Sequence, residues 1–209
     1  IIKGDAQEIS KQIEAEMMLF DYAHFMQKKK EVSYLYYHLI SGLDIPLKKN
    51  KEIYNFFDNS NYEFLHFESK EVSNVKKDFI QLYRPLLFFK GFKKSRLLKG
   101  LDLLFVYFQK SFKVNRIKQT NITLYTGANW FSITNEFAEY VLSNYDLIKN
   151  MFKYTKSSDE FFLQTLLMNS EFKDHLYKAN FNNGYISCLR YIDWTRGKPY
   201  TWTINDYNE

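Results

Sequence analysis

Residues 34–47, with the sequence YLYYHLISGLDIPL, decide the fold of this chain. Residues 34–40 form a short run of apolar and aromatic side chains, which is typical of a buried strand. The run ends in residues 41–46, a turn that contains glycine, proline and the carboxylate of Asp44. Ligands of open α/β sheets bind beyond the carboxyl ends of the strands, so Asp44 could contact a ligand. An aspartate in such a turn is more often a turn former, and both interpretations stay open here.

Helices and strands alternate on both sides of this stretch. The apolar periodicity predicts helices at residues 8–27, 50–57, 137–151 and 159–168, and strands at residues 62–67, 121–125 and 130–133. Residues 75–112 are expected to form a mostly helical, basic and aromatic insert, broken near Pro85 and Gly91. The alternation indicates an α/β fold with a largely buried, mixed central sheet. No linker or repeat divides the chain, so residues 1–209 are expected to be a single domain.

The bulk composition is that of a globular protein, with 45% hydrophobic and 25% charged residues. The single cysteine, Cys188, allows no intrachain disulfide. Because the sequence shows neither a membrane-spanning run nor a signal peptide, a cytoplasmic location is expected. The net charge is +5, and much of the excess lies between Lys76 and Arg116. Such a basic stretch is typical of a protein that binds nucleic acid, an anionic membrane surface or a phosphorylated ligand. Alternatively, it is only a solvated helical face.

Several chemistries lack their sequence motif here. There is no Gly-rich phosphate loop, no GxSxG nucleophile elbow, and no metal-ligand spacing among the four histidines. No Asp-x-Asp pair occurs, although that pair commonly holds the metal that bridges the diphosphate of a nucleotide-sugar. A donor of that kind would need arginine and lysine to neutralise its departing phosphates. We therefore expect neither a metal nor another cofactor.

Two further segments carry candidate site residues. In residues 125–133, TGANWFSI follows Tyr125, and Trp130 stands in a loop that enters a strand, where it is either core or ligand-facing. Residues 157–167 begin with Ser-x-x-Glu, a capping-box pattern in which Glu160 would only bond back to the helix start. A carboxylate at this position also points from the sheet edge toward a crevice, where it could act as a base.

Taken together and in order, these segments resemble the core 2/I-branching β-1,6-N-acetylglucosaminyltransferase family (glycosyltransferase family 14), which includes the peptide xylosyltransferases. The similarity extends from about Gln12 to Trp202. It rests on four segments: YYHLISGLDIPLKKNKEIYNFF, GANWFSIT, SSDEFFLQTLLMNS and LRYIDWTRGKPYTW. One alone would be weak, whereas four in order at comparable spacings are specific. The resemblance implies a bacterial member with a GT-A-like fold, without the N-terminal part of the nucleotide-binding βαβ region and a C-terminal segment.

The resemblance also implies the reaction. A sugar would pass with inversion, and without a metal, from a UDP-sugar to a glycan hydroxyl in cell-surface polysaccharide synthesis. UDP-N-acetylglucosamine is the expected donor and UDP-xylose the alternative. Glu160 matches the base of the family, which takes the proton of the acceptor hydroxyl as its oxygen attacks the anomeric carbon. The acceptor could be lipid-linked.

Further residues match the family's donor and acceptor positions. The donor side corresponds to Asp44, Arg190 and Trp194, with Arg196 and Lys198 as weaker candidates, and the acceptor side to Asn129, Trp130 and Asp159. The family has Asp-Trp in its xylosyltransferases where this chain has Asn-Trp. That departure disfavours xylosyl transfer to a protein serine.

Two other classes of function stay open. A basic binding module for polyanions would use the stretch from Lys76 to Arg116, although no RNA or DNA motif supports nucleic acid as the partner. Peripheral docking of this stretch on the inner face of a membrane is compatible with a transferase. A glycoside hydrolase needs two carboxylates that flank the scissile bond. Asp159 and Glu160 are not such a pair, because adjacent helical residues point in different directions.

Overall fold

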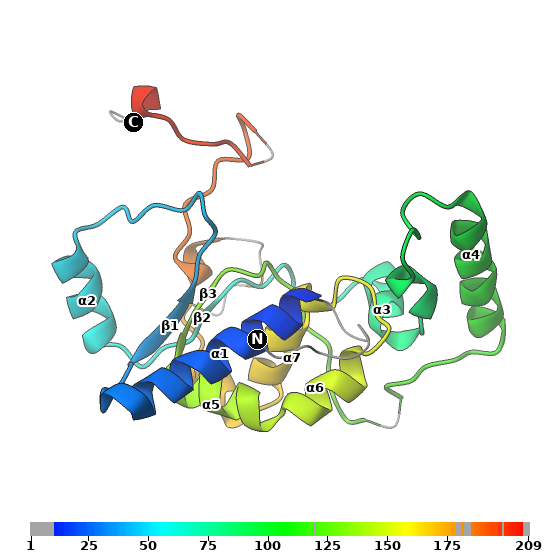
Figure 1. The fold of residues 1–209 in the computed structure, drawn as a ribbon, viewed down its shortest axis with the longest axis horizontal. Helices are drawn as coiled ribbons and strands as arrows, with labels where there is room; N and C mark the ends of the chain where they lie inside the picture. The colour runs from blue at the N-terminus through cyan, green and yellow to red at the C-terminus, as the bar shows by residue number, and fades with distance from the viewer. Residues whose placement is uncertain (1–10, 119, 179–180, 182–184, 198, 207–209) are drawn as a thin grey trace.

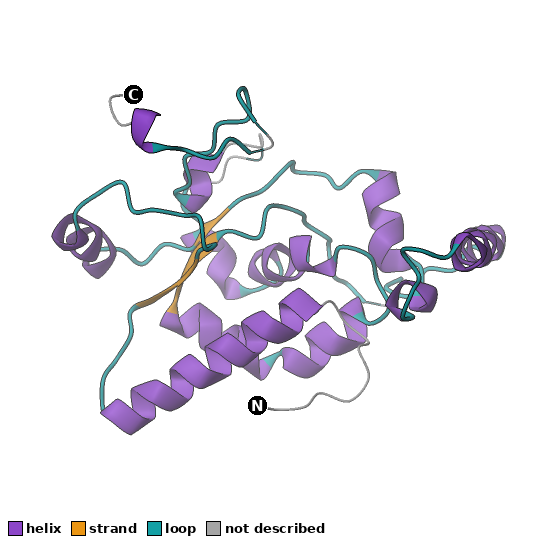
Figure 2. Ribbon diagram, turned by 45° about the horizontal axis from the view of Figure 1, so that its top comes forward, coloured by secondary structure: helices purple, strands orange, loops and turns teal. Residues whose placement is uncertain are grey.

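The computed structural model describes residues 11–118, 120–178, 181, 185–197 and 199–206, so the predicted helix start at residue 8 lies outside the described residues. Figure 1 shows a small central sheet with α1, α5, α6 and α7 gathered beside it. α2 lies beyond one side of the sheet, and α3 and α4 lie at the opposite end of the molecule. Figure 2 shows the same arrangement in a turned view. Helices around a small sheet are consistent with the predicted α/β class.

The sheet has three short strands. In sheet order they are β1 (Tyr36–Leu39), β3 (Phe131–Thr134) and β2 (Phe64–Leu65). Both pairs are antiparallel, with Leu39 and Leu65 each opposite Phe131. The predicted mixed sheet is therefore wrong for these strands. Among the described residues, parallel pairing is limited to one bridge between Glu63 and Leu176.

Residues 121–125 are not a strand, which corrects another prediction. Their backbone polar groups bond to side chains of α7 (Phe162–Met168) or of the residue that ends it. The Thr165 hydroxyl accepts from the Tyr125 N–H at 3.1 Å and donates to the Tyr125 carbonyl at 3.2 Å. In the same way, the Asn169 side chain accepts from the Thr123 N–H at 3.0 Å and donates to the Thr123 carbonyl at 2.8 Å. The backbone groups of Thr123 and Tyr125 are thus satisfied without a neighbouring strand, and apolar periodicity gives no sign of this.

The predicted helices all have counterparts. In chain order the other α-helices are α1 (Lys11–Lys30), α2 (Asn50–Asp58), α3 (Asn74–Gln81), α4 (Arg96–Ser111), α5 (Asn135–Ser143) and α6 (Tyr145–Phe152). The 3-10 helices are η1 (Pro85–Phe88), η2 (Ser158–Glu160), η3 (Glu171–His175), η4 (Tyr185–Cys188) and η5 (Ile204–Asp206). The predicted helix at 137–151 is split, because the Asn144 side chain donates to the Tyr140 carbonyl at 2.8 Å where α5 ends.

The core lies between the sheet, α1 and α7. All of residues 162–167 in α7 are buried. α1 buries Ile13, Met17 and Phe20, which recur on one face of the helix. Phe20 packs against Phe131 of the central strand, with ring centroids 5.7 Å apart. This packing holds the first turns of α1 against the end of the sheet where the cleft described below opens.

The predicted insert is present as α3, η1 and α4, which we call the helical arm (residues 74–111). Its breaks are the predicted ones: η1 begins at Pro85, and Gly91 has φ +89° shortly before α4. An ion pair between Arg84 and Asp102 attaches α4 to the start of η1. Gln109 adds two hydrogen bonds of 2.8 Å to the backbone of Tyr83.

Candidate active site

A cleft of about 700 Å³ opens where β1 and β2 end and β3 begins. The walls come from several elements. They include Gln12 and Glu16 of α1, residues 39–41 at the end of β1, His66 and Glu68 after β2, and Lys76 of α3. The remaining lining residues include 127–130 at the start of β3, and Glu160, Tyr185 and Trp194. The cleft thus lies beyond the carboxyl ends of two strands. The sequence predicts a ligand site at this kind of sheet edge.

Glu160 lines the cleft from the end of η2. The capping box suggested by the sequence is not formed: Ser157 is in the left-handed region, with φ 52°, and its side chain makes no cap hydrogen bond. The backbone of Glu160 is held instead, because its N–H donates to the Ser157 carbonyl at 3.1 Å and its carbonyl accepts from Gly127 N–H at 2.9 Å. Its half-buried carboxylate is therefore directed by the backbone and not used as a cap.

Burial raises the pKa of the Glu160 carboxyl above its ordinary value. The positive charge of Lys76 is the largest opposing influence, while the negative charges of Asp159 and Glu68 add to the rise. Lys76 also forms an ion pair with Glu68, so the cleft holds a cation and its partner close to Glu160. A carboxylate with a raised pKa is a stronger proton acceptor than an ordinary one.

The loop of residues 127–130 is fixed against His66 and α7. The Ala128 N–H donates to His66 Nδ1 at 2.8 Å, and Gln164 Nε2 donates to the Ala128 carbonyl at 2.9 Å. Gly127 is needed here, because a Cβ at this position would lie 1.8 Å from the His66 carbonyl oxygen. His66 in turn stacks on Tyr185, with centroids 4.4 Å apart. This wall of the cleft is preorganised by backbone and ring contacts.

The three predicted acceptor residues lie together. Asn129 and Trp130 line the cleft, and Asn129 Nδ2 donates to Asp159 Oδ2 at 3.0 Å. Asp159 thus lies behind Asn129 and is adjacent to Glu160 in the chain. The Asn129 Oδ1 atom is buried and has no hydrogen-bond partner among the described residues. The Trp130 ring meets Tyr185 edge-on, with centroids 6.1 Å apart. The roles of these residues stay predictions.

Two of the predicted donor residues lie beside the cleft, at the end of β1. The guanidinium of Arg190 donates to the carbonyls of Leu39 at 2.8 Å and Cys188 at 3.0 Å, while its buried Nε has no partner in the part of the chain that the structure describes. Asp44 accepts from the Ser41 N–H at 2.6 Å, the bond expected of a turn former. Burial lowers the pKa of Arg190, and the charge of Asp44 opposes that change, so the two are near each other.

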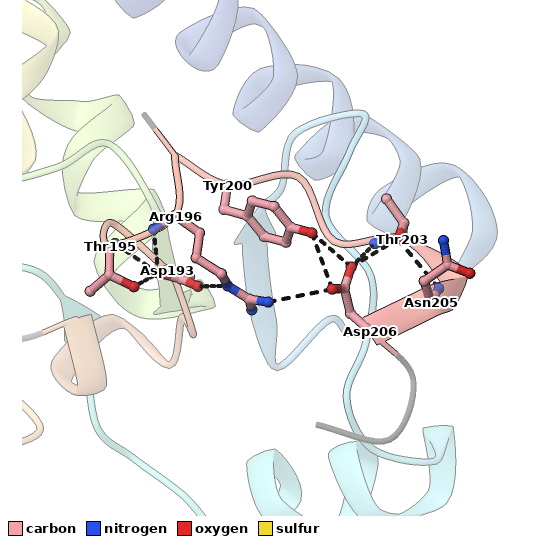
Figure 3. Close-up of polar contacts among 7 residues, drawn as sticks. All are labelled: Asp193, Thr195, Arg196, Tyr200, Thr203, Asn205 and Asp206. Carbon is pink, nitrogen blue, oxygen red and sulfur yellow. Dashed lines mark hydrogen bonds and ion pairs between the residues drawn. The ribbon is translucent and has the colours of Figure 1, made fainter.

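The remaining donor candidates lie in the C-terminal segment. Trp194 lines the cleft next to Tyr185, with centroids 5.9 Å apart. Arg196 forms ion pairs with two carboxylates, Asp193 at 2.6 Å and Asp206 at 3.4 Å (Figure 3). The Arg196 hydrogen bond is the main reason that the pKa of Asp193 lies well below its ordinary value. Lys198 lies outside the described residues.

Sequence reasoning missed a buried carboxyl group in the cleft. Glu16 of α1 lines it and is only 4% exposed. Its Oε1 atom is buried without a hydrogen-bond partner among the described residues, and burial raises its pKa to about 8. The missed signal is its position, because Glu16 falls within the apolar stripe of Ile13, Met17 and Phe20. A charged residue on such a face is a candidate functional group.

Other cleft residues carried no motif at all. They come from three separate segments and meet only in the folded chain: His66 and Glu68 after β2, Lys76 of α3, and Tyr185 of η4. Among the described residues, no group of three or more His, Cys, Asp or Glu side chains could hold a metal ion. Metal independence stays a prediction.

Comparison with protein families gives one relevant finding. A family model described as "Branch: Core-2/I-Branching enzyme" matches residues 11–209. No curated protein matches the chain. The match covers all four motif segments, each of which contributes to the lining of the cleft.

Proposed function

Because the chain belongs to the Core-2/I-Branching enzyme family, whose members are glycosyltransferases, we propose that it moves a sugar from a UDP-sugar to a glycan hydroxyl with inversion and without a metal. The family resemblance drawn from the four motifs is thereby confirmed. The proposal adds the donor, the stereochemistry, a GT-A-like fold and the roles of individual residues. N-acetylglucosamine is the proposed sugar, and xylose is the alternative within the same family.

The observation that carries the proposal is the placement of Glu160. Its carboxylate lines the cleft, takes no part in a cap, and has a pKa raised by burial. In the proposed step, the acceptor hydroxyl oxygen bonds to the anomeric carbon while the bond from that carbon to UDP breaks and its electron pair leaves on UDP. Glu160 takes the hydroxyl proton. One base is sufficient, because UDP is a good leaving group without protonation.

The rest of the cleft supports a sugar ligand. The rings of Trp130, Tyr185 and Trp194 line it, and aromatic faces pack well on the C–H groups of a pyranose. The buried Asn129 Oδ1 can accept a hydrogen bond from a sugar hydroxyl or an acetamido N–H. The Nε–H of Arg190, which has no acceptor among the described residues, is a donor that a phosphate oxygen could satisfy. These contacts are proposed roles for the predicted site residues.

The test is UDP release from a panel of UDP-sugars, with and without EDTA. We expect one donor to be turned over at the same rate in both conditions. Glu160→Gln keeps the shape of the side chain and removes the base, so kcat should fall by roughly 10²- to 10⁴-fold. Glu171→Gln, at an exposed position outside the cleft, is the matched control and should keep wild-type turnover. Full turnover by Glu160→Gln would refute the assignment of the base, and loss of turnover in EDTA would refute metal independence.

A pH profile gives an independent check on the same residue. A base must be ionised to act, so kcat/KM should fall as the pH drops through the pKa of Glu160. Because burial raises that pKa, the fall should begin above the ordinary glutamate range. A profile that stays flat down to the ordinary range would count against Glu160 as the base.

A further inference from the structure

The burial pattern of α4, in the helical arm, is the reverse of that of an ordinary surface helix. Its buried residues are the polar Asp102 and Gln109, while most of its large apolar residues are exposed. We call the exposed row the α4 stripe: Leu97, Leu101, Leu104 and Phe108, with exposed fractions of 72, 45, 49 and 50%. These residues recur every three or four positions, so they share one helix face. An apolar face of this kind on a folded protein marks an interaction surface.

The buried polar contacts fix the direction in which the stripe faces. Asp102 pairs with Arg84, and Gln109 bonds both backbone groups of Tyr83 at 2.8 Å. Rotating α4 to bury the stripe would leave these polar groups without partners, which is costly. The exposure of the stripe is therefore built into the fold. Figures 1 and 2 both show α4 at the end of the molecule that is distant from the sheet.

The surroundings of the stripe are strongly basic. Between residues 79 and 135, Asp102 is the only acidic residue, and it is already paired with Arg84. Seven cations of this region are exposed and take part in no ion pair among the described residues: Lys90, Lys93, Lys94, Arg96, Lys99, Lys113 and Lys118. An apolar stripe with basic flanks complements a surface that is apolar inside and anionic outside.

We propose that the α4 stripe and its flanking cations dock the protein on an anionic lipid surface. The apolar side chains enter the boundary between headgroups and acyl chains, and the cations pair with the headgroups. The helix lies along the surface. None of the described helices combines the length and the apolar character that passage through a bilayer requires. The inference does not rest on the proposed transfer reaction.

Two other occupants fit the surface less well. In a second copy of the chain packed stripe to stripe, the exposed cations of both copies would face each other and repel. A nucleic acid would pair with the cations but would leave the leucines and Phe108 in water, because its backbone offers no apolar partner. A lipid surface satisfies both halves of the pattern.

The test is co-sedimentation of the whole chain with vesicles. We expect binding to phosphatidylcholine vesicles that contain phosphatidylglycerol, and little binding to phosphatidylcholine alone. Leu104→Ser combined with Phe108→Ser removes apolar contact, and Lys93→Glu combined with Lys94→Glu reverses two charges. Each pair of changes should weaken binding by at least about tenfold. Because all four side chains are exposed, circular dichroism should show wild-type folding in both variants.

Matched controls use exposed residues away from the arm. Leu43→Ser with Leu47→Ser, and Lys28→Glu with Lys29→Glu, should leave vesicle binding unchanged. Equal loss in the control and arm variants would overturn the proposal, as would absence of binding to the anionic vesicles. A dimer in sedimentation velocity that the serine variant abolishes, without vesicle binding, would overturn it in favour of a second copy.

Discussion

The pKa of the Glu16 carboxyl is set by the surroundings of this side chain. It belongs to a helix face that otherwise buries apolar residues, and its carboxyl has a pKa of about 8. Burial is the main cause, the negative charge of Asp159 adds to it, and a hydrogen bond from Gln12 opposes it. At neutral pH the carboxyl therefore keeps its proton and can donate a hydrogen bond inside the cleft.

The raised pKa predicts how stability depends on pH. The pKa of this carboxyl is near the ordinary glutamate value of 4.5 in the unfolded chain and about 8 in the folded chain, so between these values the folded state binds more protons. The stabilisation is complete below pH 4.5 and is lost as the pH rises through 8. Glu16→Gln removes the titration. Relative to this variant, the wild type should lose roughly 1–4 kcal/mol of unfolding free energy between about pH 5 and pH 9.

Urea denaturation at the two pH values measures this difference directly. Glu14→Gln, two residues earlier on α1 and outside the cleft, is the matched replacement of a carboxylate by an amide. If wild type and Glu16→Gln differ by the same amount at both pH values, Glu16 does not titrate as described.

At the scale of elements, residues 121–125 show where periodicity misleads. The apolar residues there have the pattern of a strand, but the hydrogen-bond partners are side chains one turn apart on α7 and just after it. Apolar periodicity cannot distinguish a segment whose backbone pairs with a neighbouring strand from one whose backbone bonds to side chains. The helix split at Asn144 has a similar cause, since one side-chain amide ends α5.

The contact between Thr165 and Tyr125 can be tested by substitution. Thr165 is 1% exposed, and its hydroxyl satisfies both the N–H and the carbonyl of Tyr125. Thr165→Val has nearly the same shape but leaves both groups buried without a partner, so unfolding free energy should fall by about 1–3 kcal/mol. Thr165→Ser keeps the hydroxyl and should be less harmful. Equal stability of the valine variant and the wild type in urea would show that the contact is dispensable.

At the scale of the whole molecule, the sequence predicted one side of the cleft better than the other. Glu160 and Trp130 lie in segments with recognisable motifs, and both line the cleft. Glu16 and Lys76 come from helices whose sequence signals concern only packing and charge, so their meeting with Glu160 depends on tertiary packing. Arg190 was predicted from its motif, yet its bonds to strand carbonyls emerge only from the fold.

The tryptophans provide a probe of the whole cleft. Of the three, Trp130 and Trp194 line the cleft, whereas Trp202 packs against Tyr191 with centroids 5.5 Å apart. Titration with UDP-N-acetylglucosamine should change the intrinsic fluorescence, because a bound sugar alters the surroundings of the first two rings. Trp130→Phe and Trp194→Phe should each reduce the change, and Trp202→Phe should preserve it. A change that disappears only with Trp202→Phe would place the ligand elsewhere.

The order of strands in the sheet bears on how the chain is made. β3 is the central strand but is synthesised last, and within the described part of the chain β1 and β2 pair with no other strand. While the ribosome adds the helical arm and the following loop, which takes on the order of seconds, the two earlier strands have no native partner. Unpaired strand edges rich in aromatic residues are prone to pair with other chains. Until residues 131–134 emerge, the nascent chain therefore carries two strand segments whose edges are open to other chains.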